Sequence, residues 1–129
     1  MSKDLTDLEV WKKGRVFRND ISTVVKTFPV HEKYKLIDQL IRASRSITAN
    51  VAEGHGRFHF QENIQYCRQA RGSLVECYDH LTVALDEKYI THSIFDELIL
   101  MYKELIKILN GYISYLKKRK LNTQNSGPN

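Results

Sequence analysis

The strongest constraint on the fold is a seven-residue repeat between residues 93 and 118. Apolar side chains recur there at alternating spacings of four and three residues. This spacing places them on one face of a helix and is typical of helices that pack in supercoiled bundles. The repeat consists of Ile94, Leu98, Met101, Leu105, Ile108, Tyr112 and Tyr115. We therefore expect a long helix with this seam in the core.

The rest of the chain shows three further helical segments. Apolar residues at helical spacing predict helices over residues 8–28, 32–53 and 61–88, and no segment alternates as a strand would. Because the connections are short, consecutive helices should be antiparallel neighbours. The sequence therefore predicts an all-α, up-down-up-down four-helix bundle over residues 1–118. We expect residues 119–129 to form a disordered polar tail, since they include Gly and Pro.

The composition bears on where in the cell the protein is expected and on whether its cysteines form a disulfide. No apolar run approaches the ~18 residues that a membrane span requires, and charges occur throughout the first 30 residues. We therefore expect a cytoplasmic protein without a signal peptide. Cys67 and Cys77, ten residues apart on one helix, would be ~15 Å apart, which is too far for a disulfide. We expect two free thiols in the core.

The basic residues are unevenly distributed. The net charge is +5, and residues 1–72 contain 13 basic and 8 acidic residues. Residues 73–129 contain seven of each, and four of those basic residues form "KKRK" at 117–120. This pattern is consistent with an anionic partner such as nucleic acid, although a solvated basic surface is the alternative. The candidate phosphate contacts are Lys12, Lys13, Arg15, Arg18, Arg42 and Arg45.

The second helix has an unusual polar side. Opposite its apolar stripe lie small, nearly uncharged side chains, whereas a solvent-facing side is usually rich in charged residues. Glu53 follows in the last turn, where the helix dipole disfavours an anion, and Arg57 is close enough to pair with it. A solvated Glu53 is the alternative. We expect a subunit interface formed by Ala43, Ser46, Asn50, Glu53 and Arg57.

Several segments resemble the 23S rRNA-intervening-sequence proteins. They are "LEVWKKG" at 8–14, "FP" at 28–29, "QLIRASRSITANVAEGHGR" at 39–57 and "RGSLVE" at 71–76. The pattern Asn-x-Ala-Glu-Gly-x-x-Arg is filled by Asn50, Ala52, Glu53, Gly54 and Arg57, and Gly-Ser follows at 72–73. One difference is Thr48, where the family pattern has a proline that would kink the helix.

The resemblance implies a bacterial four-helix bundle that assembles as a homopentamer around a central channel. The accessory variability proteins of diversity-generating retroelements are similar, and they bind a reverse transcriptase and nucleic acid through basic surfaces. We therefore expect a non-enzymatic homo-oligomer that binds nucleic acid, with RNA favoured, or docks an enzyme such as a reverse transcriptase. The alternative is a protein-interaction scaffold without direct nucleic-acid contact.

A catalytic interpretation is the third hypothesis. Glu53, His55, Arg57 and His59 lie within seven residues and could supply an acid, a base and a phosphate clamp. His55 and His59 with Glu62 could bind a metal ion. Loop histidines at this spacing are ordinarily polar surface residues, so we expect no catalytic residue, no metal site and no cofactor.

Overall fold

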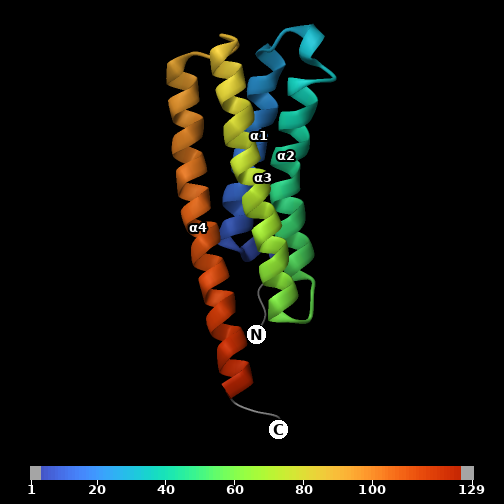
Figure 1. The fold of residues 1–129 in the computed structure, drawn as a ribbon, viewed down its shortest axis with the longest axis vertical. Helices are drawn as coiled ribbons and strands as arrows, with labels where there is room; N and C mark the ends of the chain where they lie inside the picture. Colours follow the sequence, from blue (N-terminus) through green and yellow to red (C-terminus); the bar gives the residue numbers. More distant parts are fainter. Residues whose placement is uncertain (1–3, 126–129) are drawn as a thin grey trace.

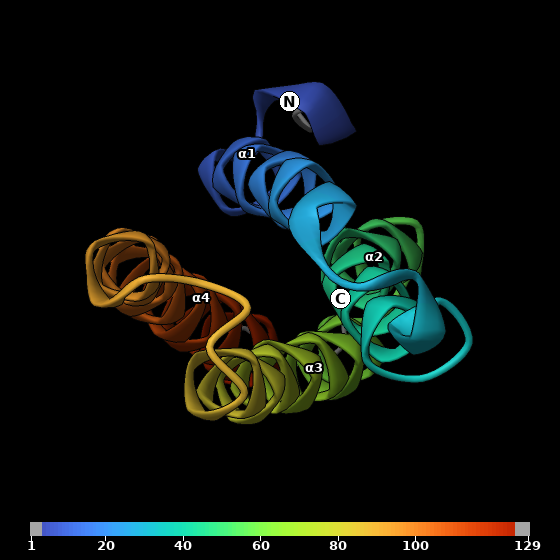
Figure 2. The same cartoon turned by 90° about the horizontal axis from the view of Figure 1, so that it is seen from above.

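The computed structural model, which describes residues 4–125, is a bundle of four helices joined by short connections. The helices are α1 (Glu9–Val24), α2 (Leu36–His55), α3 (Phe60–Asp86) and α4 (His92–Asn125), with 3-10 turns at Leu5–Asp7, Val25–Thr27 and Val30–Glu32. They run alternately up and down (Figure 1) and stand at four corners around a common core (Figure 2). No strand occurs within residues 4–125. The predicted all-α four-helix bundle is confirmed.

Each helix contributes an apolar stripe to the core. Fully buried side chains include Phe17 on α1, Leu40 on α2, Leu74 on α3 and Leu105 on α4. The predicted seam on α4 is correct in the middle, where Leu98 and Leu105 are buried. At the ends it is wrong, because Ile94 is 37% and Tyr115 is 53% exposed. A straight helix rotates by ~20° per heptad relative to an exact seven-residue repeat. The buried side of α4 therefore moves away from that repeat, and at the lower end it consists of Leu109, Ile113 and Leu116.

Several helix ends differ from the predicted ones. α1 ends at Val24, and a 3-10 turn carries the chain to Phe28, which is extended before Pro29 as the proline requires. α2 begins at Leu36 rather than at residue 32, because Val30–Glu32 forms a separate 3-10 turn.

The predicted tail at 119–129 is wrong for its first part, since α4 continues to Asn125. Gly127 and Pro128, which suggested the tail, come later and lie outside the described residues.

The helices differ greatly in length. α1 has 16 residues and α4 has 34, which correspond to ~24 Å and ~51 Å. α4 therefore extends past the turn between α2 and α3 at the lower end of the bundle (Figure 1). No helix in the described part of the chain is both long and apolar enough to cross a membrane.

Candidate nucleic-acid interface

A groove of about 520 Å³ runs along the surface between α1 and α2. Residues three, four and seven positions apart share one side of a helix, so each helix supplies one wall. The lining residues are Trp11, Arg18, Asn19 and Ser22 from α1 and Ile41, Ser44, Arg45, Thr48, Ala49 and Ala52 from α2. No Asp or Glu is among them, so the two arginines make the groove positive.

Two arginines of α1, Arg15 and Arg18, lie over the ring of Trp11, which is part of the groove lining. The guanidinium carbons of Arg15 and Arg18 each lie 5.8 Å from the centroid of the Trp11 ring. Arg18 Nη1 also donates a hydrogen bond of 2.7 Å to Thr48 Oγ1, which orients its side chain across the groove. Arg45 enters from α2. The structure thus brings three of the six predicted phosphate contacts together.

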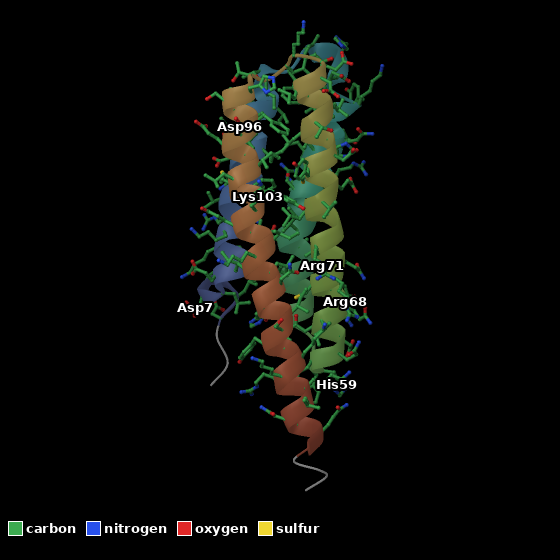
Figure 3. All side chains as sticks on the ribbon, turned by 60° about the vertical axis from the view of Figure 1, so that its left-hand side comes forward. Asp7, His59, Arg68, Arg71, Asp96 and Lys103 are labelled. Atoms are coloured by element: carbon green, nitrogen blue, oxygen red, sulfur yellow. The ribbon has the colours of Figure 1, made fainter. Side chains whose placement is uncertain are left out.

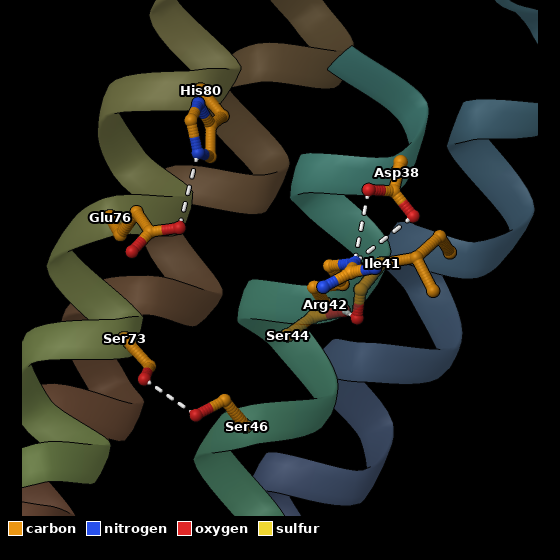
Figure 4. A network of polar contacts seen from close by, with 8 residues as sticks. All are labelled: Asp38, Ile41, Arg42, Ser44, Ser46, Ser73, Glu76 and His80. Carbon is orange, nitrogen blue, oxygen red and sulfur yellow. Dashed lines mark hydrogen bonds and ion pairs between the residues drawn. The ribbon is translucent and has the colours of Figure 1, made fainter. Parts of the chain in front are cut away.

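The other three predicted contacts lie elsewhere. Lys12 and Lys13 are exposed on α1 but do not line the groove. Arg42 forms an ion pair with Asp38, with 3.0 Å between Nε and Oδ2, and its side chain is 80% exposed (Figure 4). Such a surface pair contributes less than ~1 kcal/mol, but it partly neutralises the charge that Arg42 would offer to phosphate.

The opposite flank of α2 faces α3, which corrects the interpretation of Ala43. Ser73 Oγ donates a hydrogen bond of 2.9 Å to Ser46 Oγ (Figure 4), and Asn50 Nδ2 donates to both the carbonyl oxygen and Oγ of Ser46. Ala43, on the same flank, is only 4% exposed and belongs to the core. It is buried within one subunit and is not available to a second copy. A subunit contact at Ser46 and Asn50 stays a prediction.

The predicted pairing of Glu53 with Arg57 is present. Arg57 Nη2 donates to Glu53 Oε1 at 2.9 Å and to the Tyr66 hydroxyl at 2.8 Å, and Nη1 lies 3.5 Å from Glu62 Oε2. The hydrogen bond to Glu53 is the main cause that raises the pKa of Arg57. Within one subunit the pair is half-exposed rather than buried, and its role at a subunit interface stays a prediction.

The structure gives no support to the metal hypothesis for His55, His59 and Glu62. No group of three or more His, Cys, Asp or Glu within residues 4–125 is placed to hold a metal ion. The two cysteines are free and buried, as expected. Burial raises the pKa of Cys67 to about 11 and that of Cys77 to about 12, so both thiols are protonated at neutral pH.

A second and larger cavity at the lower end of the bundle was not predicted from the sequence. This lower cleft has a volume of about 830 Å³ and combines aromatic and basic side chains. Its lining includes His55, Arg57, Phe58, Phe60, Tyr115 and Arg119. The signal that could have revealed it is "YISYLKKRK" at 112–120, where aromatic and basic residues mix. The predicted boundary at residue 118 divides that segment between the last helix and the tail.

Comparisons with known proteins agree with this fold. A family profile described as 23S rRNA-intervening sequence protein matches residues 6–111. The chain is also similar to a crystal structure of a protein of unknown function from the S23 ribosomal protein family of Bacteroides thetaiotaomicron VPI-5482. The TM-score is 0.73 and the identity 24%, over 81% of this chain and 97% of that chain, so this likeness concerns the fold. The comparison with curated proteins found no match. Because the profile covers most of the chain, the protein belongs to the 23S rRNA-intervening sequence protein family.

Proposed function

We propose that this protein is a non-enzymatic homo-oligomer that binds nucleic acid, with RNA favoured, through the α1–α2 groove. The observation that carries the proposal is a groove lined by Arg18 and Arg45 with no acidic lining residue. Trp11 lies in the same lining, with the guanidinium groups of Arg15 and Arg18 over its ring. Guanidinium groups match phosphate geometry with paired hydrogen bonds, and an indole ring offers a stacking surface for a base.

Arg18 is well prepared for this role. A guanidinium has five N–H donors, so the bond to Thr48 Oγ1 leaves others for a phosphate oxygen. That bond also fixes the side chain before the ligand arrives, which reduces the entropy lost on binding. The small side chains of Ala49 and Ala52 keep the α2 wall low.

A homopentamer is part of the same proposal, on the strength of the family resemblance. Gly72 supports it independently. This glycine is exposed inside α3, where glycine costs ~1 kcal/mol relative to alanine, and nothing in the subunit lies within 4 Å of the position of a Cβ. Its small size would serve contact with a second copy. The expected solution mass by light scattering is five times 15.1 kDa, and a stable monomer would contradict the assembly.

Fluorescence anisotropy with a structured RNA hairpin tests the binding. Affinity should fall between about 50 and about 200 mM salt, since phosphate contacts release counterions. Replacing both groove arginines, Arg18→Gln with Arg45→Gln, should weaken binding and reduce the slope of log K against log salt by about 1.5. The emission of Trp11, the single tryptophan, should also change on binding.

The matched control removes two charges from the other side of the bundle. Arg68→Gln with Lys103→Gln, on α3 and α4 (Figure 3), should leave affinity near that of the unmodified protein. If the hairpin fails to bind at both salt concentrations, or if both double variants weaken it equally, the groove is not the site. The scaffold hypothesis, with a reverse transcriptase or another protein as the partner, would then take its place.

A further inference from the structure

The lower cleft exists because α1 is short. α1 begins at Glu9, whereas α4 continues downward to Asn125 (Figure 1). Below Glu9, α1 no longer runs beside α4, and Leu8, Glu9 and Val10 at its start line the top of the cleft. Tyr112, Tyr115 and Arg119 lie on one flank of α4 at spacings of three and four residues and line the cleft.

The opposite wall is the connection between α2 and α3. Phe58, at its centre, is 93% exposed, and its ring contacts the His59 ring edge-on at a centroid distance of 5.0 Å. A phenylalanine side chain left in water contributes none of the stabilisation that its burial would give to the folded subunit. Tyr115, across the cleft, is 53% exposed. Two large aromatic surfaces thus face an open cavity.

Contacts with neighbouring side chains fix the orientation of several aromatic rings in the cleft. The rings of Tyr112 and Tyr115 are nearly parallel, with 6.2 Å between centroids and 16° between planes. The side chain of Asn63, which is 7% exposed, donates a hydrogen bond of 3.3 Å to the Tyr112 hydroxyl. The guanidinium carbon of Arg119 lies 5.7 Å from the Phe60 centroid. These contacts orient flat surfaces and a cation toward one space.

The charge of this end is also distinctive. Residues 105–125 carry five basic residues and no acidic one, whereas residues 76–104 carry seven acidic and two basic residues. Asp96 marks the acidic end of α4 in Figure 3, and α4 passes from there to the cleft. Among the described residues, Glu9 is the one carboxylate in the cleft lining. This excess belongs to the α4 side of the cleft, because Asp7 and Glu9 lie at the start of α1 and Arg57 is paired with Glu53 and Glu62 on the other side. An anionic ligand is therefore attracted to the α4 wall.

We propose that the lower cleft binds unstacked bases of single-stranded RNA next to a duplex, an inference that rests on the proposed function. Bases stack on Phe58 and Tyr115, while their phosphates contact Arg119 and the lysines beside it. Aromatic platforms in a positive groove are the usual means of binding single strands. The volume of about 830 Å³ lies in the range of small-ligand pockets, which suits a nucleotide.

The test compares a blunt RNA hairpin with the same hairpin carrying a single-stranded tail of about six uridines. The tail should strengthen binding by about tenfold, since stacking of bases on aromatic side chains adds to affinity. Phe58→Ala combined with Tyr115→Ala should remove that gain and leave the affinity for the blunt hairpin unchanged. Both side chains are more than half exposed, so the variant should fold, as its circular-dichroism melt would verify.

Tyr34→Ala is the matched control, because Tyr34 is 84% exposed in the connection between α1 and α2 at the upper end. Equal binding of both hairpins by the unmodified protein, or an equal loss in the control, overturns the role of the cleft and leaves the groove proposal standing. Failure of both hairpins to bind overturns both proposals. A drop in solution mass of the double variant without RNA would show a second copy in the cleft, which also overturns the inference.

Discussion

The two flanks of α2 carry similar small residues but are used in different ways. On the side of α3, a Cβ at Gly54 would lie 2.6 Å from Asn63 Oδ1 and 3.0 Å from the Asn63 carbonyl oxygen. On the side of α1, a Cβ at Gly14 would lie 2.9 Å from Thr48 Cγ2. At Gly54 the space for a Cβ is closed by the side chain and the backbone of Asn63, and at Gly14 it is closed by one methyl group of Thr48. Beside that methyl the groove opens at Ala49.

This difference shows that small side chains have two structural meanings. On the flank that faces α3, small side chains allow α2 and α3 to pack closely, and the Ser46–Ser73 hydrogen bond links the two helices (Figure 4). Toward α1 they leave space, in which Arg18 and Arg45 gather. The first set stabilises the subunit, and the second set forms the candidate binding surface. Substitutions should therefore affect stability on one flank and RNA binding on the other.

The largest effect is expected from Gly54→Ala. The new methyl would collide with the Asn63 side-chain oxygen at 2.6 Å and press on the Asn63 carbonyl oxygen and Tyr66 Cβ at 3.0 Å. The Asn63 side chain is bonded to Tyr112 and Cys67, so it can move only by losing these hydrogen bonds. Overpacking of this kind costs ~1–3 kcal/mol or more, and the helix propensity of alanine returns ~1 kcal/mol. We expect the free energy of unfolding to fall by about 2 kcal/mol in urea denaturation at a fixed protein concentration.

Gly111→Ala, on α4, is the control for this substitution, because Gly111 is exposed and open space surrounds the position of its Cβ. It should raise the free energy of unfolding of the isolated subunit by up to ~1 kcal/mol. Equal effects of the two substitutions would show that α2 and α3 are not in close contact in solution.

Ala43→Leu should have the next largest effect. Ala43 is buried at the α3 flank, and the additional carbon atoms of leucine exceed the available space. We expect a loss of about 1.5 kcal/mol in the free energy of unfolding, in the range for overpacked cores. Urea denaturation measures it, with Ala43→Ser as a variant of nearly unchanged size. If the leucine variant were as stable as the unmodified protein, this flank would be open, as the sequence alone suggests.

The position of Ala43 shows which features of the fold could be predicted from the sequence and which could not. The helical periodicity predicts the bundle, because apolar spacing determines which side of each helix is buried. It predicts the rotation of α2 less well. The apolar stripe is centred on Ile37, Ser44 and Val51 in the sequence, and Ser44 and Val51 are buried. The buried side of α2 also extends to Leu36, Leu40 and Ala43, on one side of that line. Apolar spacing alone could not show whether a small residue lies at the edge of the core or on the surface, since alanine and serine occur in both environments.

The two candidate sites were predictable to different degrees. The groove arginines Arg18 and Arg45 were predicted, because charge and helix position are visible in the sequence. That they line one groove with Trp11 could not be predicted, because it depends on the packing of α1 on α2. The lower cleft depends on where α1 begins relative to α4, and helix ends are set by tertiary contacts more than by local propensity. Phe58 lies in a loop without periodicity, so nothing local marks it.

Gly14→Ala should have a smaller effect than either change on the α3 flank. Its methyl would press on Thr48 Cγ2, and Thr48 is held by Arg18 and stiff at χ1. We expect a loss of about 1 kcal/mol in the free energy of unfolding. In a Thr48→Ser background the methyl is gone while the hydroxyl remains, so the same change should be neutral or stabilising. Additive effects in this double-mutant cycle would contradict the contact.

Ala49→Leu should have the smallest effect on stability. Ala49 is exposed on the wall of the groove, so the free energy of unfolding should change by less than ~0.5 kcal/mol. The larger side chain would occupy the space between Arg18 and Arg45 and weaken binding of the blunt hairpin by about fivefold, or ~1 kcal/mol. Ala49→Ser, which keeps the wall low, should bind as the unmodified protein does. Anisotropy and urea denaturation on the same samples separate the two quantities. If Ala49→Leu instead lost stability as Ala43→Leu does, the groove would be closed in solution and the two flanks of α2 would be alike.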